Sequence, residues 1–420
     1  MPQTASTPSP GQASKTTSGT DHPPATPGEL RAAMVQALRD DGAITSEPVA
    51  AAFTAVPRHL FAPGETLEAA YAPLGTLMPK HDADGLLLSV ISAPNIQAMT
   101  LEPAAIEPGM RVLEVGSGGC NAALIAELTG PDGQVTTVDI DPEVTTRTRA
   151  CLDAAGYELV RVVLADAEHG VPDGAPYDRI IITAGAWDIP PAWLSQLAPD
   201  GRLVVPLRLR GLTRTVTFER DGDGLVSRHY QLAAFVPFQG EGAHADRKVL
   251  LRDGIVLHTD DPDLRIDTRL LNAALDAPQA ELWTGARYDF PDEVSLFTTL
   301  NSPHVAQLRA SQEAIDQGVV GRRARYGVPA MITGGSIAYR TARQASDDPA
   351  THESGVIAHG PQAESLAEQY AGLLRRWARD YCRRGSALFR YLPGGTVPGQ
   401  LPPGAIAIAK RHGVLMVTWP

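Results

Sequence analysis

The chain has 420 residues, of which 43% are hydrophobic and 20% charged, and its formal net charge is −12. This length and hydrophobic content are typical of a globular protein with two or three domains, and the acidic balance argues against general binding to nucleic acids. No apolar run reaches the roughly 18 residues needed to cross a bilayer, so we expect no membrane partner.

The N-terminal residues 1–28 are rich in Ser, Thr, Pro and Gly and predict a disordered tail. They have neither the basic nor the apolar region of a secretory signal. The three cysteines, Cys120, Cys151 and Cys382, follow no metal-binding or disulfide spacing. We therefore expect a cytoplasmic protein that holds no metal.

Helices are expected over residues 29–40, where apolar residues recur on one face, and over residues 47–55. From about Ile91 short apolar strands alternate with helices as far as residue 207, which predicts an α/β domain with a doubly wound parallel sheet. Two alternating runs then surround the sequence DGDG at 221–224. They predict a hairpin that closes the sheet as an antiparallel edge.

Beyond Glu241 the pattern predicts a second, α+β unit with several short strands. Helices are expected near residues 263–275 and 362–384, and the last sixteen residues resemble a closing hairpin. The predicted organisation is a tail at 1–28, an α/β domain at 29–240 and a C-terminal α+β extension at 241–420.

The most informative segment is RVLEVGSGGCNAAL at residues 111–124, where an apolar strand enters a glycine turn and then a helix. Gly116 and Gly118 lack a Cβ atom, so the backbone can turn sharply and approach a ligand. Because Asn121 interrupts the G-x-G-x-x-G pattern of dinucleotide sites, the segment favours S-adenosylmethionine over a nicotinamide cofactor. The alternative is a surface turn without a ligand.

Acidic residues at two strand ends support a ligand site. Glu114 would receive the amino group of the methionine moiety, and Asp139 would accept hydrogen bonds from both ribose hydroxyls. Asp166 ends the next strand, where it can accept from the adenine amino group or cap a helix. Thr183 ends the fourth strand, near the position where ligands of such sheets bind.

Several segments, taken together in their order and spacing, resemble the protein-L-isoaspartate O-methyltransferase family over roughly half of the chain. They are VPRHLFAP (56–63), ISAPNIQAM (91–99), the glycine loop, LADAEHG (164–170), APYDRIIITAGAWDIP (175–190), QLAPDGRLVVPL (196–207) and AAFVPFQG (233–240). The phrases VDIDP, AGAWDIPPAW and RGLTRTVTF also resemble an actinobacterial subgroup that accompanies lanthipeptide and related ribosomal peptide pathways and carries a C-terminal extension.

The resemblance implies a Rossmann-like class I methyltransferase fold with S-adenosylmethionine as cofactor, and it places Ser92 in the catalytic position. The alternative for Ser92 is a helix N-cap, since Ala-Pro-Asn follows it. Gln97 stands where the family often has histidine. The complete set of predicted cofactor contacts is Ser89, Ile91, Gln97, Glu114, Gly116, Ser117, Gly118, Asn121, Asp139, Ile140, Asp166, Ala167 and Thr183.

Other charged groups have a structural and a functional interpretation. His59, with Arg58, is expected to order the N-terminal segment rather than to act in catalysis. Two arginine clusters form either solvated helix faces or a contact surface for an acidic peptide; they are Arg322, Arg323 and Arg325, and Arg375, Arg376, Arg379, Arg383 and Arg384.

The expected function is S-adenosylmethionine-dependent methylation of an aspartyl carboxylate in a ribosomally made, lanthipeptide-like peptide, leading through a succinimide to isoaspartate. The alternatives are repair of isoaspartyl residues in damaged proteins and a non-catalytic scaffold that binds a precursor peptide. A nicotinamide-dependent oxidoreductase is disfavoured by Asn121. The C-terminal extension is the expected peptide-substrate domain.

Overall fold

The computed structural model describes residues 25–420 apart from residues 84, 117, 253, 289–290, 346–350 and 395–400. Most of the predicted tail lies outside these residues. The first helix, α1 (Pro27–Asp40), begins two residues before the predicted start. It begins there because Thr26 forms a capping box, in which its hydroxyl accepts from the Glu29 amide and the Glu29 carboxylate accepts from the Thr26 amide.

The N-terminal region covers one face of the main sheet. It consists of α2 (Glu47–Ala55), the short helices η1 (Arg58–Phe61) and α3 (Leu67–Ala70), the hairpin of β1 (Leu77–His81) and β2 (Leu87–Ile91), and α4 (Pro94–Ala104). Val112 and Ile181 of the sheet share a hydrophobic core with apolar residues of α1, α2 and α4. This packing places the segment around Ser92 beside the end of the central strand.

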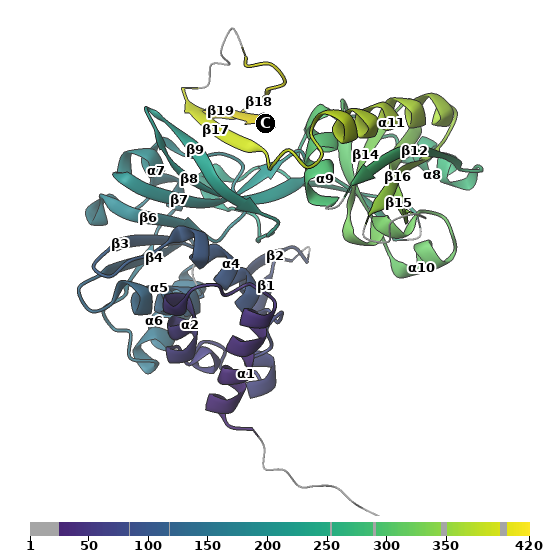
Figure 1. Ribbon diagram of the computed structural model, residues 1–420. Coiled ribbons are helices and arrows are strands. Elements are labelled where there is room, and N and C mark those ends of the chain that lie inside the picture. The colour runs from purple at the N-terminus through teal and green to yellow at the C-terminus, as the bar shows by residue number, and fades with distance from the viewer. Residues whose placement is uncertain are drawn as a thin grey trace, which may run out of the picture.

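The main sheet has ten strands and contains the predicted parallel strands (Figure 1). Its parallel part is β3 (Arg111–Val115), β4 (Gln134–Asp139), β5 (Arg161–Leu164), β6 (Tyr177–Ile182) and the first half of β7 (Leu197–Leu209). The connecting helices are α5 (Cys120–Thr129), α6 (Pro142–Ala154) and α7 (Pro191–Gln196). The order β7-β6-β3-β4-β5 reverses direction between β6 and β3, which is where ligands bind in doubly wound sheets. The predicted fold class is confirmed.

The predicted hairpin is present as β8 (Leu212–Asp221) and β9 (Gly224–Gln231), but its position at the edge of the sheet was wrong. Three strands from the C-terminus continue the sheet beyond β9 in the order β17 (Leu388–Pro393), β19 (Gly413–Thr418) and β18 (Ile406–Ala409). Of these, β17 pairs with backbone groups that β9 would otherwise expose. Phe389 and Tyr391 of β17 extend the buried face.

A second sheet of seven antiparallel strands lies between β9 and β17 in the sequence. In spatial order its strands are β10 (Arg247–Leu250), β11 (Ile255–Thr259), β13 (Val305–Ala310), β14 (Val328–Thr333), β15 (Ser336–Gln344), β16 (His352–His359) and β12 (Ala280–Tyr288). Its helices are α8 (Thr268–Asp276), α9 (Pro291–Asn301), α10 (Gln312–Asp316), η5 (Arg322–Tyr326) and α11 (Ala363–Asp380). The amphipathic α11 buries Leu366, Tyr370 and Leu374 against this sheet (Figure 1).

The two sheets share one hydrophobic core. The cluster that contains Leu113 and Ile182 of the main sheet continues through Phe297 and Trp377 of the second unit to Trp419. The rings of Phe297, Trp377, Tyr381 and Trp419 lie 5.2–6.3 Å from one another. Residues 241–420 therefore supply both the second sheet and the last strands of the first, and the two parts are packed together.

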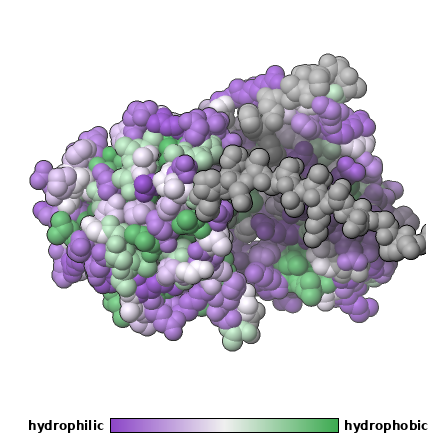
Figure 2. All heavy atoms as spheres, turned by 90° about the horizontal axis from the view of Figure 1, so that it is seen from below, coloured by the Kyte–Doolittle hydropathy of each residue, from purple (hydrophilic) through white to green (hydrophobic). Residues whose placement is uncertain are grey.

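The surface is mixed in polarity. Figure 2 shows hydrophilic residues over most of one face, with hydrophobic residues in small separate groups. Within the described residues no helix is both long and apolar enough to span a membrane.

Candidate active site

A cavity lies at the carboxyl ends of β3, β4 and β6, beside the point where the strand order reverses. It brings together residues from β2, the start of α4, the glycine loop, the tip of β4 and the end of β6. Twelve of the fourteen predicted site residues line it, namely Ser89, Ile91, Ser92, Gln97, Glu114, Gly116, Gly118, Asn121, Asp139, Ile140, Ala167 and Thr183. Ser117 lies outside the described residues, and Asp166 does not line the cavity.

The glycine loop leaves no space for a side chain at Gly116 or Gly118. Gly116 has a φ of +90°, and a Cβ atom added there would lie 2.6 Å from Oγ1 of Thr183. The Thr183 hydroxyl donates to the carbonyl oxygens of Val115 at 3.0 Å and Gly116 at 2.9 Å. A Cβ atom on Gly118 would lie 2.8 Å from Cγ1 of Ile91. The end of β6 and the end of β2 therefore hold the loop closely on two sides.

Glu114 is a fully buried carboxylate at the end of β3. Asn121 donates from Nδ2 to its Oε1 at 2.8 Å, and the Thr137 hydroxyl donates to its Oε2 at 2.6 Å. Burial raises the pKa of Glu114 to about 7, although both hydrogen bonds oppose the shift, and the nearby Asp139 carboxylate adds to it. A cation bound beside Glu114 would favour its ionised form.

The two ends of the Asn121 side-chain amide have different surroundings. Its Nδ2 donates to Glu114, while its buried Oδ1 has no hydrogen-bond partner among the described residues, although the residue lines the cavity. Buried acceptors are rarely left unpaired. The set formed by Glu114, Asn121 Oδ1 and Asp139 offers oxygen acceptors to an ammonium group and to hydroxyl groups, which fits the methionine and ribose parts of S-adenosylmethionine.

The tip of β4 is held in place from both sides. The Asp141 amide donates to Oδ1 of Asp139 at 2.9 Å, which orients the Asp139 carboxylate. Lys80 of β1 donates to Oδ2 of Asp141 at 2.6 Å, so the β1–β2 hairpin is tied to this tip. Both Asp139 and the hairpin residue Ser89 line the cavity.

Arg58 orders the segment that carries Ser92. It is 2% exposed and donates to the carbonyl oxygens of Ala70 at 2.9 Å and Ser92 at 2.8 Å, and to Oε1 of Gln97 at 2.6 Å. His59 does not line the cavity, and its Nδ1 lies 2.8 Å from the hydroxyl of Tyr71. The predicted structural role of this pair is confirmed.

The alternative interpretation of Ser92 as a helix cap is wrong. Helix α4 begins at Pro94 with Ala93 as its N-cap residue, and no side chain caps it. Ser92 precedes the cap and lines the cavity, and Arg58 donates to its carbonyl oxygen. Its predicted catalytic role stays a prediction.

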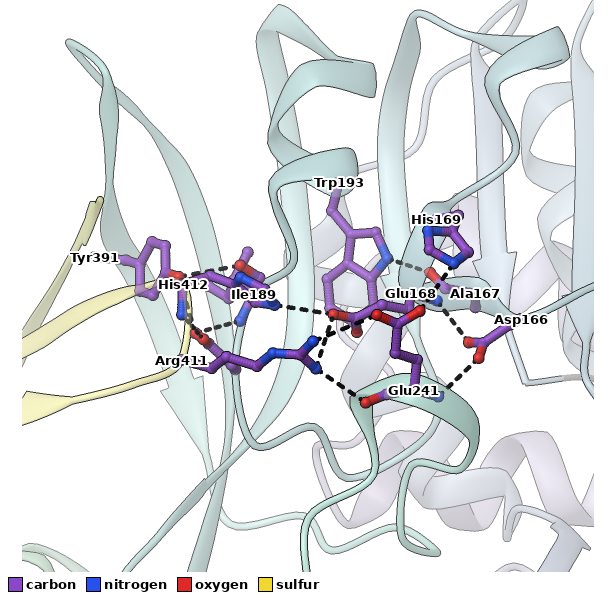
Figure 3. Close-up of polar contacts among 11 residues, drawn as sticks. Asp166, Ala167, Glu168, His169, Ile189, Trp193, Glu241, Tyr391, Arg411 and His412 are labelled. Carbon is purple, nitrogen blue, oxygen red and sulfur yellow. Dashed lines mark hydrogen bonds and ion pairs between the residues drawn. The ribbon is translucent and has the colours of Figure 1, made fainter. Parts of the chain in front are cut away.

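Asp166 has the role of a cap. Its carboxylate accepts from the amides of Glu168 at 2.9 Å and Glu241 at 2.8 Å, and so starts the short helix η2 (Ala167–His169) (Figure 3). The neighbouring Ala167 does line the cavity, and its carbonyl oxygen accepts from Nε1 of Trp193 at 2.7 Å. The predicted contact between Asp166 and adenine stays a prediction, and its observed contacts hold the cavity wall.

One wall was not predicted as part of the site. Residues 235–239 line the cavity. Gly185 donates to the carbonyl oxygen of Val236 at 2.7 Å, and Gln239 donates from Nε2 to the carbonyl oxygen of Leu88 at 3.1 Å. The segment AAFVPFQG was one of those that carry the family resemblance, but it has no charged group that would indicate chemistry.

Comparison with known proteins agrees with this geometry. The model of the family described as protein-L-isoaspartate(D-aspartate) O-methyltransferase matches residues 29–243, about half of the chain. The chain belongs to the protein-L-isoaspartate O-methyltransferase family. It is therefore a protein carboxyl O-methyltransferase, and its cofactor is S-adenosylmethionine.

Similar members of the family come from archaea. The protein-L-isoaspartate O-methyltransferase of Methanopyrus kandleri is 40% identical over 214 residues, which are 50% of this chain and 92% of the relative. That of Hyperthermus butylicus is 40% identical over 223 residues, 51% of this chain and 90% of the relative. A solved structure titled protein-L-isoaspartate O-methyltransferase aligns with 92% of this chain and 99% of its own, with a TM-score of 0.49 and 20% identity.

Proposed function

We propose that the protein methylates the side-chain carboxylate of an aspartyl residue in a ribosomally made, lanthipeptide-like peptide. The neighbouring backbone amide nitrogen then attacks the methyl ester and expels methanol, which forms a succinimide. Hydrolysis of the succinimide gives isoaspartate and aspartate. The observation that carries this proposal is the second sheet, which lies beyond the residues that the family model matches and shares a hydrophobic core with the methyltransferase part.

The cofactor supplies an electrophilic methyl group on its sulfonium. The acceptor carboxylate is ionised near pH 7, so the chain does not have to provide a strong base. Its residues have to hold the acceptor oxygen in line at about 3 Å and exclude water. In this proposal the Ser92 hydroxyl positions the acceptor, while Arg58 fixes the backbone at Ser92 through its carbonyl oxygen.

Cofactor recognition is assigned to the oxygen acceptors of the cavity. Glu114 and Asn121 Oδ1 would hold the methionine ammonium group, and Asp139 would hold the ribose hydroxyls. The side chain of Gln97 accepts a hydrogen bond from Arg58 and the residue lines the cavity. Arg58 therefore orients this predicted cofactor contact. None of these assignments uses a histidine.

The second unit is assigned to the peptide. In η5, Arg322 and Arg325 are exposed, and Arg325 lies 5.8 Å from the ring of Tyr326, which is 80% exposed. These groups suit an acidic peptide with an aromatic or extended segment. On α11, by contrast, Arg375 pairs with Glu368 and Arg379 pairs with Asp380, as expected for a solvated helix face.

A co-expressed lanthipeptide precursor tests the proposal. Mass spectrometry should show the gain of one methylene unit, followed by loss of methanol to give a net loss of one water. The Arg322→Ala/Arg325→Ala variant should raise KM for this peptide by about tenfold, with the affinity for S-adenosylhomocysteine unchanged.

The alternatives give different results. Efficient turnover of generic isoaspartyl peptides with no change in an aspartyl precursor would support repair of damaged proteins and overturn the proposal. A non-catalytic scaffold would bind the precursor without any change in its mass.

A further inference from the structure

The tight turn of the C-terminal hairpin contacts the wall of the cofactor cavity. It consists of Lys410, Arg411 and His412, between β18 and β19. These three consecutive residues together contact three segments of the methyltransferase part, namely η2, η4 and the loop after β6. Figure 3 shows Arg411 and His412 reaching from the hairpin towards Glu168 and Glu241.

His412 contacts the short helix η2. Its Nε2 lies 3.0 Å from Oε1 of Glu168, whose side chain is only 8% exposed. Its backbone amide donates to Oδ2 of Asp188, and Oδ1 of the same carboxylate accepts from the hydroxyl of Tyr391 at 2.8 Å. Glu168 directly follows Ala167, which lines the cavity. The hairpin therefore contacts η2 at the residue next to Ala167 of the cavity wall.

Arg411 contacts the short helix η4 (Gly240–Gly242). It donates from Nη1 to the carbonyl oxygen of Glu241 at 3.1 Å, and its Nη2 lies 3.3 Å from Oε1 of the same residue. Glu241 also donates its amide to Asp166 at 2.8 Å. The cavity residues 235–239 immediately precede η4, so Arg411 restrains the end of that wall.

Lys410 contacts the loop after β6. Its Nζ donates to the carbonyl oxygen of Arg208 at 2.8 Å and lies 3.4 Å above the ring of Trp187. That ring stacks on His244 with the ring centres 3.8 Å apart. Trp187 follows Thr183 and Ala184, which line the cavity. Burial lowers the pKa of Lys410 to about 7, and the protonated form of its amine is attracted to the face of the indole ring.

We propose that the Lys410–His412 turn is a positioning element of the cofactor site. It holds η2, the segment 235–242 and the loop after β6 at the spacing that S-adenosylmethionine requires. The turn lies outside residues 29–243, which the family model matches, so this positioning element belongs to the C-terminal extension. The inference concerns cofactor binding and does not depend on which peptide is methylated.

The physical basis is preorganisation. The three wall segments are joined to one another by a few hydrogen bonds, among them Gly185 to Val236 and Glu241 to Asp166. The turn adds contacts to each segment, so less ordering remains to be done when the cofactor binds. The contacts of His412 and Lys410 are largely buried, so water screens them less than it screens exposed ion pairs. Their loss should therefore reduce affinity for the cofactor more than it changes the overall fold.

Calorimetry of S-adenosylhomocysteine binding to the full chain tests the proposal. The Glu168→Gln variant keeps the side-chain shape, and His412→Ala removes the nearer of the two partners of Glu168, the other being Arg411 at 4.0 Å. Each should raise the dissociation constant about tenfold, and the double variant should raise it by less than the product of the two single effects. Arg411→Lys should retain more affinity than Arg411→Ala.

The matched control is Arg390→Ala, because Arg390 of β17 forms an ion pair with Asp221 that also joins the C-terminal strands to the methyltransferase part. This pair lies away from the cavity, so its loss should leave the dissociation constant within about twofold of the starting value. Well-folded Glu168→Gln and His412→Ala proteins that bind S-adenosylhomocysteine as tightly as Arg390→Ala would overturn the proposal. If His412→Ala does not fold, Glu168→Gln alone decides.

Discussion

Asn121 donates from its side-chain amide to the buried carboxylate of Glu114 at 2.8 Å, and in the part of the chain that the structure describes its own Oδ1 has no partner beside the cavity. The two residues lie seven positions apart, one at the end of β3 and one in the first turn of α5. This arrangement orients the amide so that its donor is used within the protein. Its acceptor remains for a ligand.

Replacing Glu114 with Gln should weaken binding of the cofactor about a hundredfold. The change removes a negative charge next to the expected ammonium group, and hydrogen bonds to charged groups contribute about 1.5–3 kcal/mol. Calorimetry with S-adenosylhomocysteine measures the effect. Asp173→Asn is the control, because Asp173 is an exposed carboxylate away from the cavity. Equal affinity of the two variants would contradict the assignment of Glu114.

Glu114 should also make the cofactor-free protein less stable as the pH rises. Its pKa is raised by burial from 4.5 to about 7, so between these values the folded state binds a proton that the unfolded state has lost. The part of the free energy of unfolding that depends on protonated Glu114 is therefore fully present below pH 4.5. It is lost progressively up to pH 7, by about 3 kcal/mol in total.

The measurement is the free energy of unfolding of wild type and Glu114→Gln across this range. The comparison is needed because His359 has the opposite pH dependence. Burial lowers its pKa to about 4, so its contribution to the free energy of unfolding is lost as the pH falls. Glu114→Gln should become the more stable of the two proteins as the pH rises. A constant difference between the curves would show that Glu114 does not titrate in this window.

Replacing Ser92 with Ala should lower kcat without lowering stability. Since α4 is capped at Ala93 and not by the Ser92 hydroxyl, the free energy of unfolding should change by less than about 0.5 kcal/mol. A capping role would instead cost about 1 kcal/mol. Loss of the positioning hydroxyl should reduce kcat about tenfold or more. Denaturant unfolding measures the change in the free energy of unfolding, and steady-state kinetics measure the change in kcat. A loss of stability with a normal kcat would exclude the catalytic assignment.

The sequence was sufficient to predict the parallel sheet and most of the cavity, because both depend on local pattern. Strand and helix alternate in order, and the residues at the ends of parallel strands meet at one edge of the sheet. Glu114, Asp139 and Thr183 were placed correctly at that edge for this reason.

The contacts that the sequence did not reveal are those between distant segments. Asp166 accepts from the amide of Glu241, 75 positions later, and that contact favours the cap over a ligand role. Strand β17 pairs with β9 although all strands of the second sheet lie between the two in the sequence. No local feature of β9 therefore indicates that another strand covers its edge. The apolar wall at residues 235–239 carries no chemical group that would mark it as part of a site.

The glycine loop supplies a prediction that separates backbone strain from lack of space. Gly116 and Gly109 have similar φ values, +90° and +83°, so alanine is strained at both positions. Only at Gly116 would the added Cβ atom meet another group, the Thr183 hydroxyl at 2.6 Å, whereas at Gly109 nothing lies within 4 Å. Gly109→Ala should therefore cost about 1 kcal/mol of stability and leave cofactor affinity unchanged. Gly116→Ala should cost more and should abolish measurable binding of S-adenosylhomocysteine, because displacing Thr183 moves the cavity wall. Thermal unfolding and calorimetry of both variants provide the comparison, and equal binding by the two would show that the close contact with Thr183 is not required for the site.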